Sequence, residues 1–174
     1  MILTAENGVD ARHEEITRAA AAWAKFFVQS DLEALKLAAG DPEITPEGDI
    51  YPITPDSKLG LVGDCALVDM GQIRVDTPHR HKSPELEAHI PLLGSAVMSI
   101  GDRVVDMTSG RLAEVVPLET PHFIVPGRRG YLVAVVNFPD FDPNRQIPVN
   151  TTNPPADFNA GLYTAAVGSQ QPAL

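Results

Sequence analysis

The sequence predicts an all-β domain, an antiparallel sandwich or barrel, that is preceded by α-helices. Three observations lead to this fold class. Between residues 59 and 138 the chain contains about eight short apolar runs, spaced roughly ten residues apart. Turn-forming residues separate these runs, and no interval of helical periodicity lies between them. Helical periodicity is confined to the residues before position 40, which favours antiparallel over parallel strands.

Two helices are expected before the sheet. Apolar residues recur at three- and four-residue steps over residues 16–27, which indicates an amphipathic helix with one buried face. A second helix is expected over residues 31–39, after a potential capping box in which Ser30 and Glu33 satisfy the free amides at its start. Four prolines in residues 41–58 exclude helix there, so this segment is expected to be extended or a loop.

The apolar runs are the expected strands, and they divide the chain into three parts of one domain. The runs are 65–68, 73–75, 86–93, 96–100, 103–107, 112–116, 123–125 and 131–138. Residues 1–58 form the helices and an extended lead-in, residues 59–138 the β-barrel, and residues 139–174 a tail. The tail is rich in proline and is expected to be irregular, with apolar residues that pack on the barrel.

Composition excludes several classes of partner. With 23 Asp and Glu against 13 Lys and Arg, the net charge of -10 would repel both nucleic acid and an anionic bilayer. No apolar stretch approaches the ~20 residues that cross a bilayer, and residues 1–6 lack the regions of a signal peptide. We therefore expect a cytoplasmic protein without nucleic-acid or membrane partners. The single Cys65, in an apolar run, is expected to be a buried, inert thiol.

Histidines cluster within the β region. Four of the five histidines lie between residues 79 and 122. His79 and His81 are separated by one residue, so on a strand their side chains point to the same face and can share one cation. His122 begins a later run that an antiparallel sheet can place beside the first. The sequence thus predicts a metal bound by two or three histidines and one carboxylate, with open positions for water or substrate.

Acidic residues after the turn at 82–84 can supply the carboxylate. Glu85, Glu87 and His89 follow the period of a strand and are expected to share one face. The glutamate that is not a ligand, or His89, could move protons near the metal, because burial beside another carboxylate raises the pKa of a carboxyl group. The alternatives are a solvated glutamate, an ion pair with Arg74 or Arg103, and a hydrogen-bonded core histidine.

These residues resemble the first motif of the cupin superfamily. That motif places His-x-His three or four residues before a glutamate and a glycine seven positions after the glutamate. His79 and His81 match its histidines. Glu85 has the expected spacing from His81, whereas Glu87 has the expected spacing to Gly94.

The second cupin motif, Pro-x-Gly-x-x-His, is matched in part. Pro117 and His122 stand at the expected positions. Glu119 occupies the place of the motif's glycine. The full motif ends in an asparagine after the histidine, and Pro126 occupies that place. The resemblance covers residues 71–137 and implies a cupin-type antiparallel β-barrel, or jelly roll, together with a homodimer.

The resemblance also implies an interior divalent ion, which could be iron, manganese, zinc, nickel or cobalt, with iron and zinc as the first candidates. Residues 79–92 are similar to the 4-hydroxylaminobenzoate lyase family, and this likeness favours Glu85 as the ligand. The expected metal ligands are therefore His79, His81, Glu85 and His122, and the expected catalytic residues are Glu87 and His89.

The expected function is that of a metal-dependent enzyme that acts on a small organic molecule. A non-redox metal acting as a Lewis acid, with Glu87 or His89 moving protons, would give a lyase, isomerase or cyclase. Fe(II) in the same ligand set would give a dioxygenase. A cupin that binds a small ligand without catalysis is a third alternative. Candidates for the cavity wall include Phe123, Tyr131 and Val133.

Overall fold

The structure is a computed structural model that describes residues 5–71 and 74–169. Residue 73, which begins the run expected at 73–75, lies outside the described residues, as do positions 1–4 and 170–174 of the expected terminal parts. The helices are α1 (Ala5–Val28), α2 (Leu32–Ala39) and α3 (Ala160–Ser169). None of the helices in these described ranges is long and apolar enough to span a membrane.

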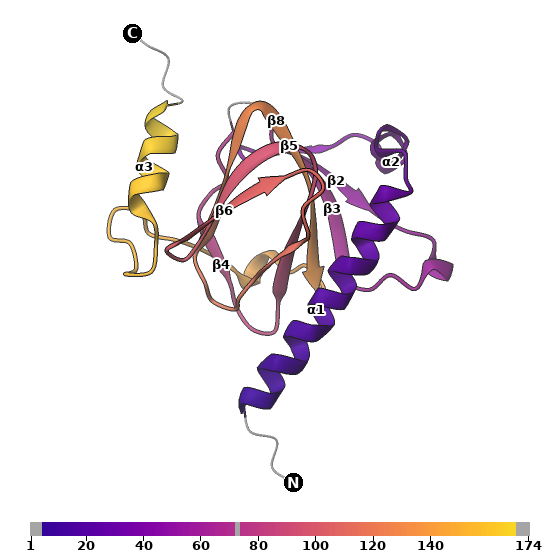
Figure 1. Cartoon of the computed structure of the whole chain (residues 1–174), viewed down its shortest axis with the longest axis horizontal. Helices are drawn as coiled ribbons and strands as arrows, with labels where there is room; N and C mark the ends of the chain where they lie inside the picture. Colours follow the sequence, from indigo (N-terminus) through magenta and orange to yellow (C-terminus); the bar gives the residue numbers. More distant parts are fainter. Residues whose placement is uncertain (1–4, 72–73, 170–174) are drawn as a thin grey trace.

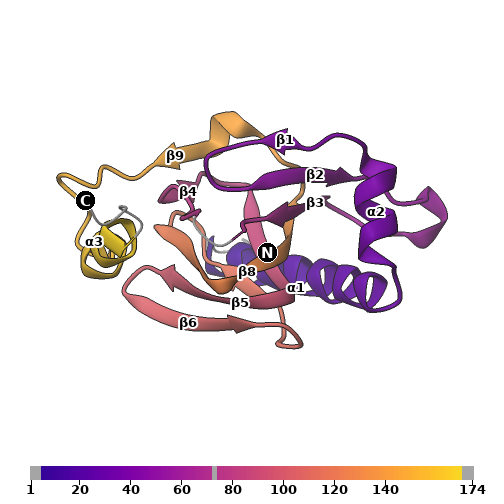
Figure 2. The same ribbon diagram turned by 90° about the horizontal axis from the view of Figure 1, so that it is seen from above.

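All the strand pairs are antiparallel. The strands are β1 (Glu43–Ile44), β2 (Asp49–Ile53), β3 (Asp64–Asp69), β4 (His79–His81), β5 (Leu86–Ile100), β6 (Arg103–Thr108), β7 (Glu114–Val116), β8 (His122–Phe138) and β9 (Gln146–Pro148). The order β1-β2-β3-β8-β4-β9 forms one path, and β5 pairs with β6, β7 and β8. Figure 2 shows β1, β2 and β9 on one side and β5 and β6 on the other, so the sheet curls into a half-barrel. The expectation of a mostly antiparallel β fold with N-terminal helices is confirmed.

Two long strands form the centre of this sheet. Strands β5 and β8 pair along most of their length, with register irregularities near Pro91–Leu93 and Gly94–Ala96. Gly94 has a φ of 77°, and a Cβ atom there would lie 2.2 Å from the carbonyl oxygen of Gly130. The first irregularity inserts one extra residue in β5 between Pro91 and Leu93, so it reverses which alternate residues face the interior, as a bulge does. Inward-facing residues are therefore odd-numbered at the start of β5, at Glu87 and His89, and even-numbered at its end, at Met98.

Helix α1 covers the outer face of β3, β5 and β8 (Figure 1). Trp23 is fully buried in a cluster that includes Phe27, Leu67 and Leu132. The indole Nε1 of Trp23 donates a hydrogen bond to the carbonyl of Val62 at 2.9 Å. The expected amphipathic helix thus closes one face of the sheet and leaves the opposite face free to form the barrel interior.

Local chemistry differs from the expectation at the start of α2. Asp31 is the N-cap, and its carboxylate accepts hydrogen bonds from the amides of Glu33 and Ala34. Ser30 does not cap the helix, because its hydroxyl donates to the carbonyl of Phe26 in the last turn of α1. An ionised carboxylate at a helix start is also favoured by the helix dipole.

The segments expected to be extended or irregular contain regular structure. Residues 41–58 contribute β1 and β2 to the sheet. Pro52 is tolerated in β2 because β1 pairs only with Asp49 and Ile50, so one side of β2 is unpaired at Pro52. The tail contributes β9, which pairs with β4, and α3, so its contacts with β4 extend the sheet beside the histidines.

Replacing Trp23 with alanine is predicted to lower the free energy of unfolding by about 3–5 kcal/mol, because the change empties the contact between α1 and the sheet. Val28, at the end of the same helix, is 87% exposed. The control Val28→Ala is expected to stay within about 0.5 kcal/mol of the wild type. Urea unfolding followed by circular dichroism measures both values. Equal stabilities of the two variants would show that α1 is not part of the core.

Candidate metal centre

Four side chains from three strands converge inside the barrel. His79 and His81 come from β4, Glu87 from β5 and His122 from β8. One donor atom from each of the four lies within 4.8 Å of the other three. The register explains the convergence, since His79 is directly opposite His122 in the β4–β8 pair. This group could hold one metal ion.

The rings of His79 and His122 are oriented by backbone carbonyls. Nδ1 of His79 lies 2.8 Å from the carbonyl oxygen of Thr77, and Nδ1 of His122 lies 3.1 Å from that of Thr120. Because a carbonyl only accepts, Nδ1 carries a proton in both rings, and Nε2 is the nitrogen that faces the other donors of the group. Burial and the neighbouring His122 lower the pKa of His79. Its buried Nε2 makes no hydrogen bond, as expected of a neutral imidazole ligand.

His81 is oriented by Glu85. Nδ1 of His81 lies 2.9 Å from Oε1 of Glu85. Its Nε2 makes no hydrogen bond and lies 3.0 Å from Oε2 of Glu87. A carboxylate that holds the far nitrogen of a ligand histidine is a common arrangement around protein-bound metals. All three histidines of the group therefore have an acceptor at Nδ1 and turn Nε2 toward the other donors, and Nε2 of His122 lies 3.1 Å from Oε1 of Glu87.

Glu85, the expected carboxylate ligand, lies outside the group of four donors, and Glu87 takes that place. The reason is the position of the strand boundary. Strand β5 begins at Leu86, and the amide of Glu85 still belongs to the turn, where it donates to the carbonyl of Lys82. The alternation of a strand therefore does not extend back to Glu85, and its side chain lies behind His81 rather than beside Glu87.

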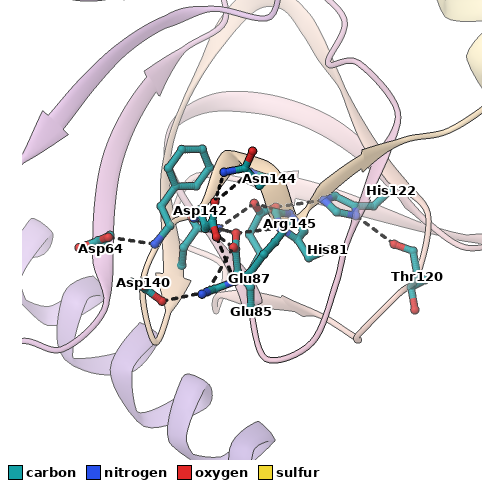
Figure 3. Close-up of polar contacts among 12 residues, drawn as sticks. Asp64, His81, Glu85, Glu87, Thr120, His122, Asp140, Asp142, Asn144 and Arg145 are labelled. Carbon is teal, nitrogen blue, oxygen red and sulfur yellow. Dashed lines mark hydrogen bonds and ion pairs between the residues drawn. The ribbon is translucent and has the colours of Figure 1, made fainter.

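Glu85 is held by residues that sequence reasoning missed. Its Oε1 accepts a hydrogen bond from Nδ2 of Asn137 at 3.0 Å, and its Oε2 accepts one from the amide of Asp142 at 3.1 Å. Arg145 lies 4.0 Å from Oε2 and also pairs with Asp140. Figure 3 follows these contacts from Asp140 through Arg145 to Glu85, with His122 on the far side of Glu87. Only strand pairing could have found Asn137, which is directly opposite Glu87 in β8.

Glu87 is a buried carboxylate surrounded by imidazoles. Burial alone would raise its pKa, but His89, His81 and His122 outweigh burial and hold the pKa well below its usual range. Burial likewise opposes the charged form of His81, but Glu87 and Glu85 outweigh it and raise the pKa of His81 to about 9. The two carboxylates thus stabilise a positive charge beside them, whether it is a proton on an imidazole or a metal cation.

His89 lies next to the group of four donors. It is 3% exposed, and its Nε2 contacts Oε1 of Glu87. Its buried Nδ1 has no hydrogen-bond partner within the described residues. The ion pairs considered from the sequence do not form with either glutamate, because Arg74 pairs with Asp49 and Arg103 pairs with Glu114.

A cavity of about 870 Å³ opens beside these residues. Its wall includes His79, Glu87 and His89 from the site and Val133 from β8. Of the wall candidates named from the sequence, Val133 is confirmed. Tyr131 lies in the apolar core and Phe123 packs on the aromatic rings of the tail, so neither lines the cavity.

The backbone at Glu119 matches the departure noted in the second motif. Glu119 has a φ of 57°, in the left-handed region that favours glycine, which is the residue that the cupin motif has at this position. Its amide donates a hydrogen bond to the carbonyl of His81 at 3.1 Å. The turn before β8 is therefore joined directly to the His-x-His strand.

Comparisons with known proteins place the fold. The sequence matches no family model and no curated protein. Among solved structures, an oxalate decarboxylase aligns with a TM-score of 0.51 at 18% identity, over 66% of this chain and 31% of the other. The oxalate decarboxylase of Lactobacillus farciminis aligns at 0.50 and 21% identity, over 65% and 35%. CapF of Staphylococcus aureus, a capsular polysaccharide assembling protein, aligns at 0.50 and 19%, over 61% and 30%.

These similarities concern the fold. The aligned part is about a third of each of the three larger chains, at 30–35% of their length. At identities of 18–21% they carry no information on substrate. All three are cupin-fold proteins, and the antiparallel half-barrel of this chain agrees with that fold. The chain therefore has the cupin fold that its two motifs resemble.

Proposed function

We propose that the protein is a metal-dependent cupin enzyme that acts on a small organic molecule. In this proposal His79, His81, Glu87 and His122 hold one divalent ion. The observation that carries it is the common orientation of the three histidines. Each has an acceptor at Nδ1 and an Nε2 that belongs to the buried group around Glu87.

The donor set fits a first-row divalent metal. Three imidazoles and one carboxylate suit iron, manganese, zinc, nickel or cobalt, with iron and zinc as the first candidates. The buried Nε2 atoms of His79 and His81 support the fit, since unpaired buried nitrogens are costly without a ligand. When bound, such an ion would polarise a substrate oxygen and lower the pKa of a bound water.

His89 is the proposed proton carrier. If Glu87 is a ligand, it cannot also act as the free acid or base, and Glu85 is closed off behind His81. The neutral tautomer of His89 that donates from Nε2 to Glu87 leaves a lone pair on Nδ1. Since His89 lines the cavity, this nitrogen could take a proton from a substrate or return one. The lyase, isomerase or cyclase proposal rests on this nitrogen.

The same four donors would also accept Fe(II) and so support a dioxygenase as the second candidate. Nothing in the donor set favours one class, whereas the unpaired Nδ1 of His89 favours acid–base chemistry. A cupin that binds its ligand without turnover would need the cavity but not the proton carrier. The three alternatives differ in oxygen consumption and in their dependence on His89.

The two glutamates are predicted to affect metal binding differently. Glu85→Gln is expected to weaken the metal affinity by about 10- to 100-fold, because it leaves the four donors in place but changes the group that orients His81. Glu87→Gln and His81→Ala should weaken it further, because each removes a ligand. Metal content after desalting and competition with a chelator of known affinity measure these effects.

Glu33→Gln is the matched control for the glutamate variants, since the Glu33 side chain is 80% exposed and remote from the histidines. It is expected to keep the wild-type metal content. Loss of metal from Glu85→Gln with full retention by Glu87→Gln would instead make Glu85 the ligand. Stoichiometric metal in His81→Ala would refute the site.

His89→Gln is predicted to keep full metal content and to lower kcat by about 100-fold or more, the usual range for the loss of a general acid or base. The control is His13→Gln, because His13 is an exposed residue of α1. A panel of small molecules is screened with the Zn(II), Mn(II) and Fe(II) forms, and oxygen is followed with an electrode. Turnover only with Fe(II) and with oxygen uptake would establish the dioxygenase. Turnover by His89→Gln at the wild-type rate would contradict the role of His89 as the proton carrier.

A further inference from the structure

The cavity wall is acidic away from the donor group. Besides Glu87, it contains the carboxylates of Glu43, Glu47, Asp64 and Asp76. None of the described residues that line it is a lysine or arginine. All 13 lysines and arginines of the sequence lie within the described part of the chain, and none of them lines the cavity.

The nearby arginines are engaged elsewhere. Arg74 pairs with Asp49 at 2.5 Å, and neither residue lines the cavity. Arg145 lies near Glu85 and pairs with Asp140 at 3.0 Å, on the side of Glu85 that faces the tail. A carboxylate or phosphate group of a ligand would therefore meet no arginine or lysine in the cavity wall, and it would lie among carboxylates.

Asp76 is the acidic residue of the wall that lies beside His79. Its backbone amide donates to the carbonyl of Ile124 at 3.0 Å, which ties it to β8. Its side chain is 14% exposed, and no described lysine or arginine pairs with it. Nδ1 of His79 lies 4.0 Å from Oδ1 of Asp76, which is beyond hydrogen-bond distance. Glu47 lies close by and accepts a hydrogen bond from the hydroxyl of Thr77.

The rest of the cavity wall indicates the chemical character of the ligand. Apolar side chains, among them Val68, Ile124 and Val133, line the same cavity as the histidines and the acidic residues. The buried Nδ1 of His89, in the same wall, has no hydrogen-bond partner within the described residues, which independently indicates that a polar ligand group completes the site.

We infer that the substrate is a small organic cation, an amine with an apolar body that presents an oxygen to the metal and its ammonium group to Asp76 and Glu47. This inference rests on the proposed function, because the oxygen is bound by the ion that the histidines hold. An ammonium group would donate hydrogen bonds to carboxylates that have no cationic partner. The net charge of -10 adds an attractive field for such a molecule.

The test compares three catechols that share a metal-binding head and carry short tails of different charge. Dopamine is the cation, 4-methylcatechol the neutral compound and 3,4-dihydroxyphenylacetate the anion. Each is titrated calorimetrically at low ionic strength into the Zn(II)-loaded protein, into Asp76→Asn and into Glu47→Gln. Glu33→Gln is again the control. Metal content and circular dichroism are measured first on every sample.

Dopamine is expected to bind about tenfold or more tightly than the anion to the wild type, as one unscreened charge contact suggests. The ratio of the two affinities should fall at least about threefold in Asp76→Asn or, if that change disturbs His79 and its metal, in Glu47→Gln. It should not change in Glu33→Gln. The test uses the ratio of two affinities measured on the same protein. A substitution that weakens the binding of all three compounds equally leaves this ratio unchanged and cannot be mistaken for the expected result.

Two failures are distinguishable. A wild-type protein that takes up no metal would contradict the proposed function itself. A protein that takes up the metal but binds the anion as tightly as dopamine, or binds none of the three compounds, would overturn only the amine assignment. Unchanged affinity ratios in both Asp76→Asn and Glu47→Gln would overturn it as well.

Discussion

The site depends on the burial of one negative charge. Glu87 is 3% exposed and lies against the rings of His81, His89 and His122. A buried carboxylate is tolerated only when positive charge or hydrogen-bond donors compensate for the lost water. In this barrel the compensation comes from imidazoles, which can carry a proton or bind a cation through the same nitrogen. The proposed function depends on this property, because a metal ion can take the place of a proton beside Glu87.

The sheet supplies the positions that this arrangement needs. Strands β5 and β8 hold Glu87 directly opposite Asn137, and β4 places His79 directly opposite His122. Ladder hydrogen bonds fix these pairs, and helix α1 covers the outer face of the same strands. The donors are therefore carried by rigid elements rather than loops, which suits a site whose function depends on fixed ligand geometry.

A second layer fixes the rings. Backbone carbonyls hold two histidines and Glu85 holds the third, while Asn137 connects Glu85 to Glu87. The tail completes this layer, since the amide of Asp142 donates to Glu85. Residues far from the motifs in sequence thus determine which nitrogen of each histidine is available. Their contribution explains why a segment that reads as irregular packs beside the most polar part of the barrel.

The sequence by itself determined the fold class, the histidines and the presence of a carboxylate close to them, because alternation in strands and the spacing of His79 and His81 are local properties. It left open which glutamate belongs to the group, and the expected choice, Glu85, differs from the structure. That choice depends on where β5 begins. If the turn before β5 were one residue longer or shorter, the side chains at the start of the strand would point to the opposite face of the sheet. The charge of the cavity wall was likewise decided only by tertiary structure, because Asp76 and Glu47 reach the same space from segments far apart in the chain.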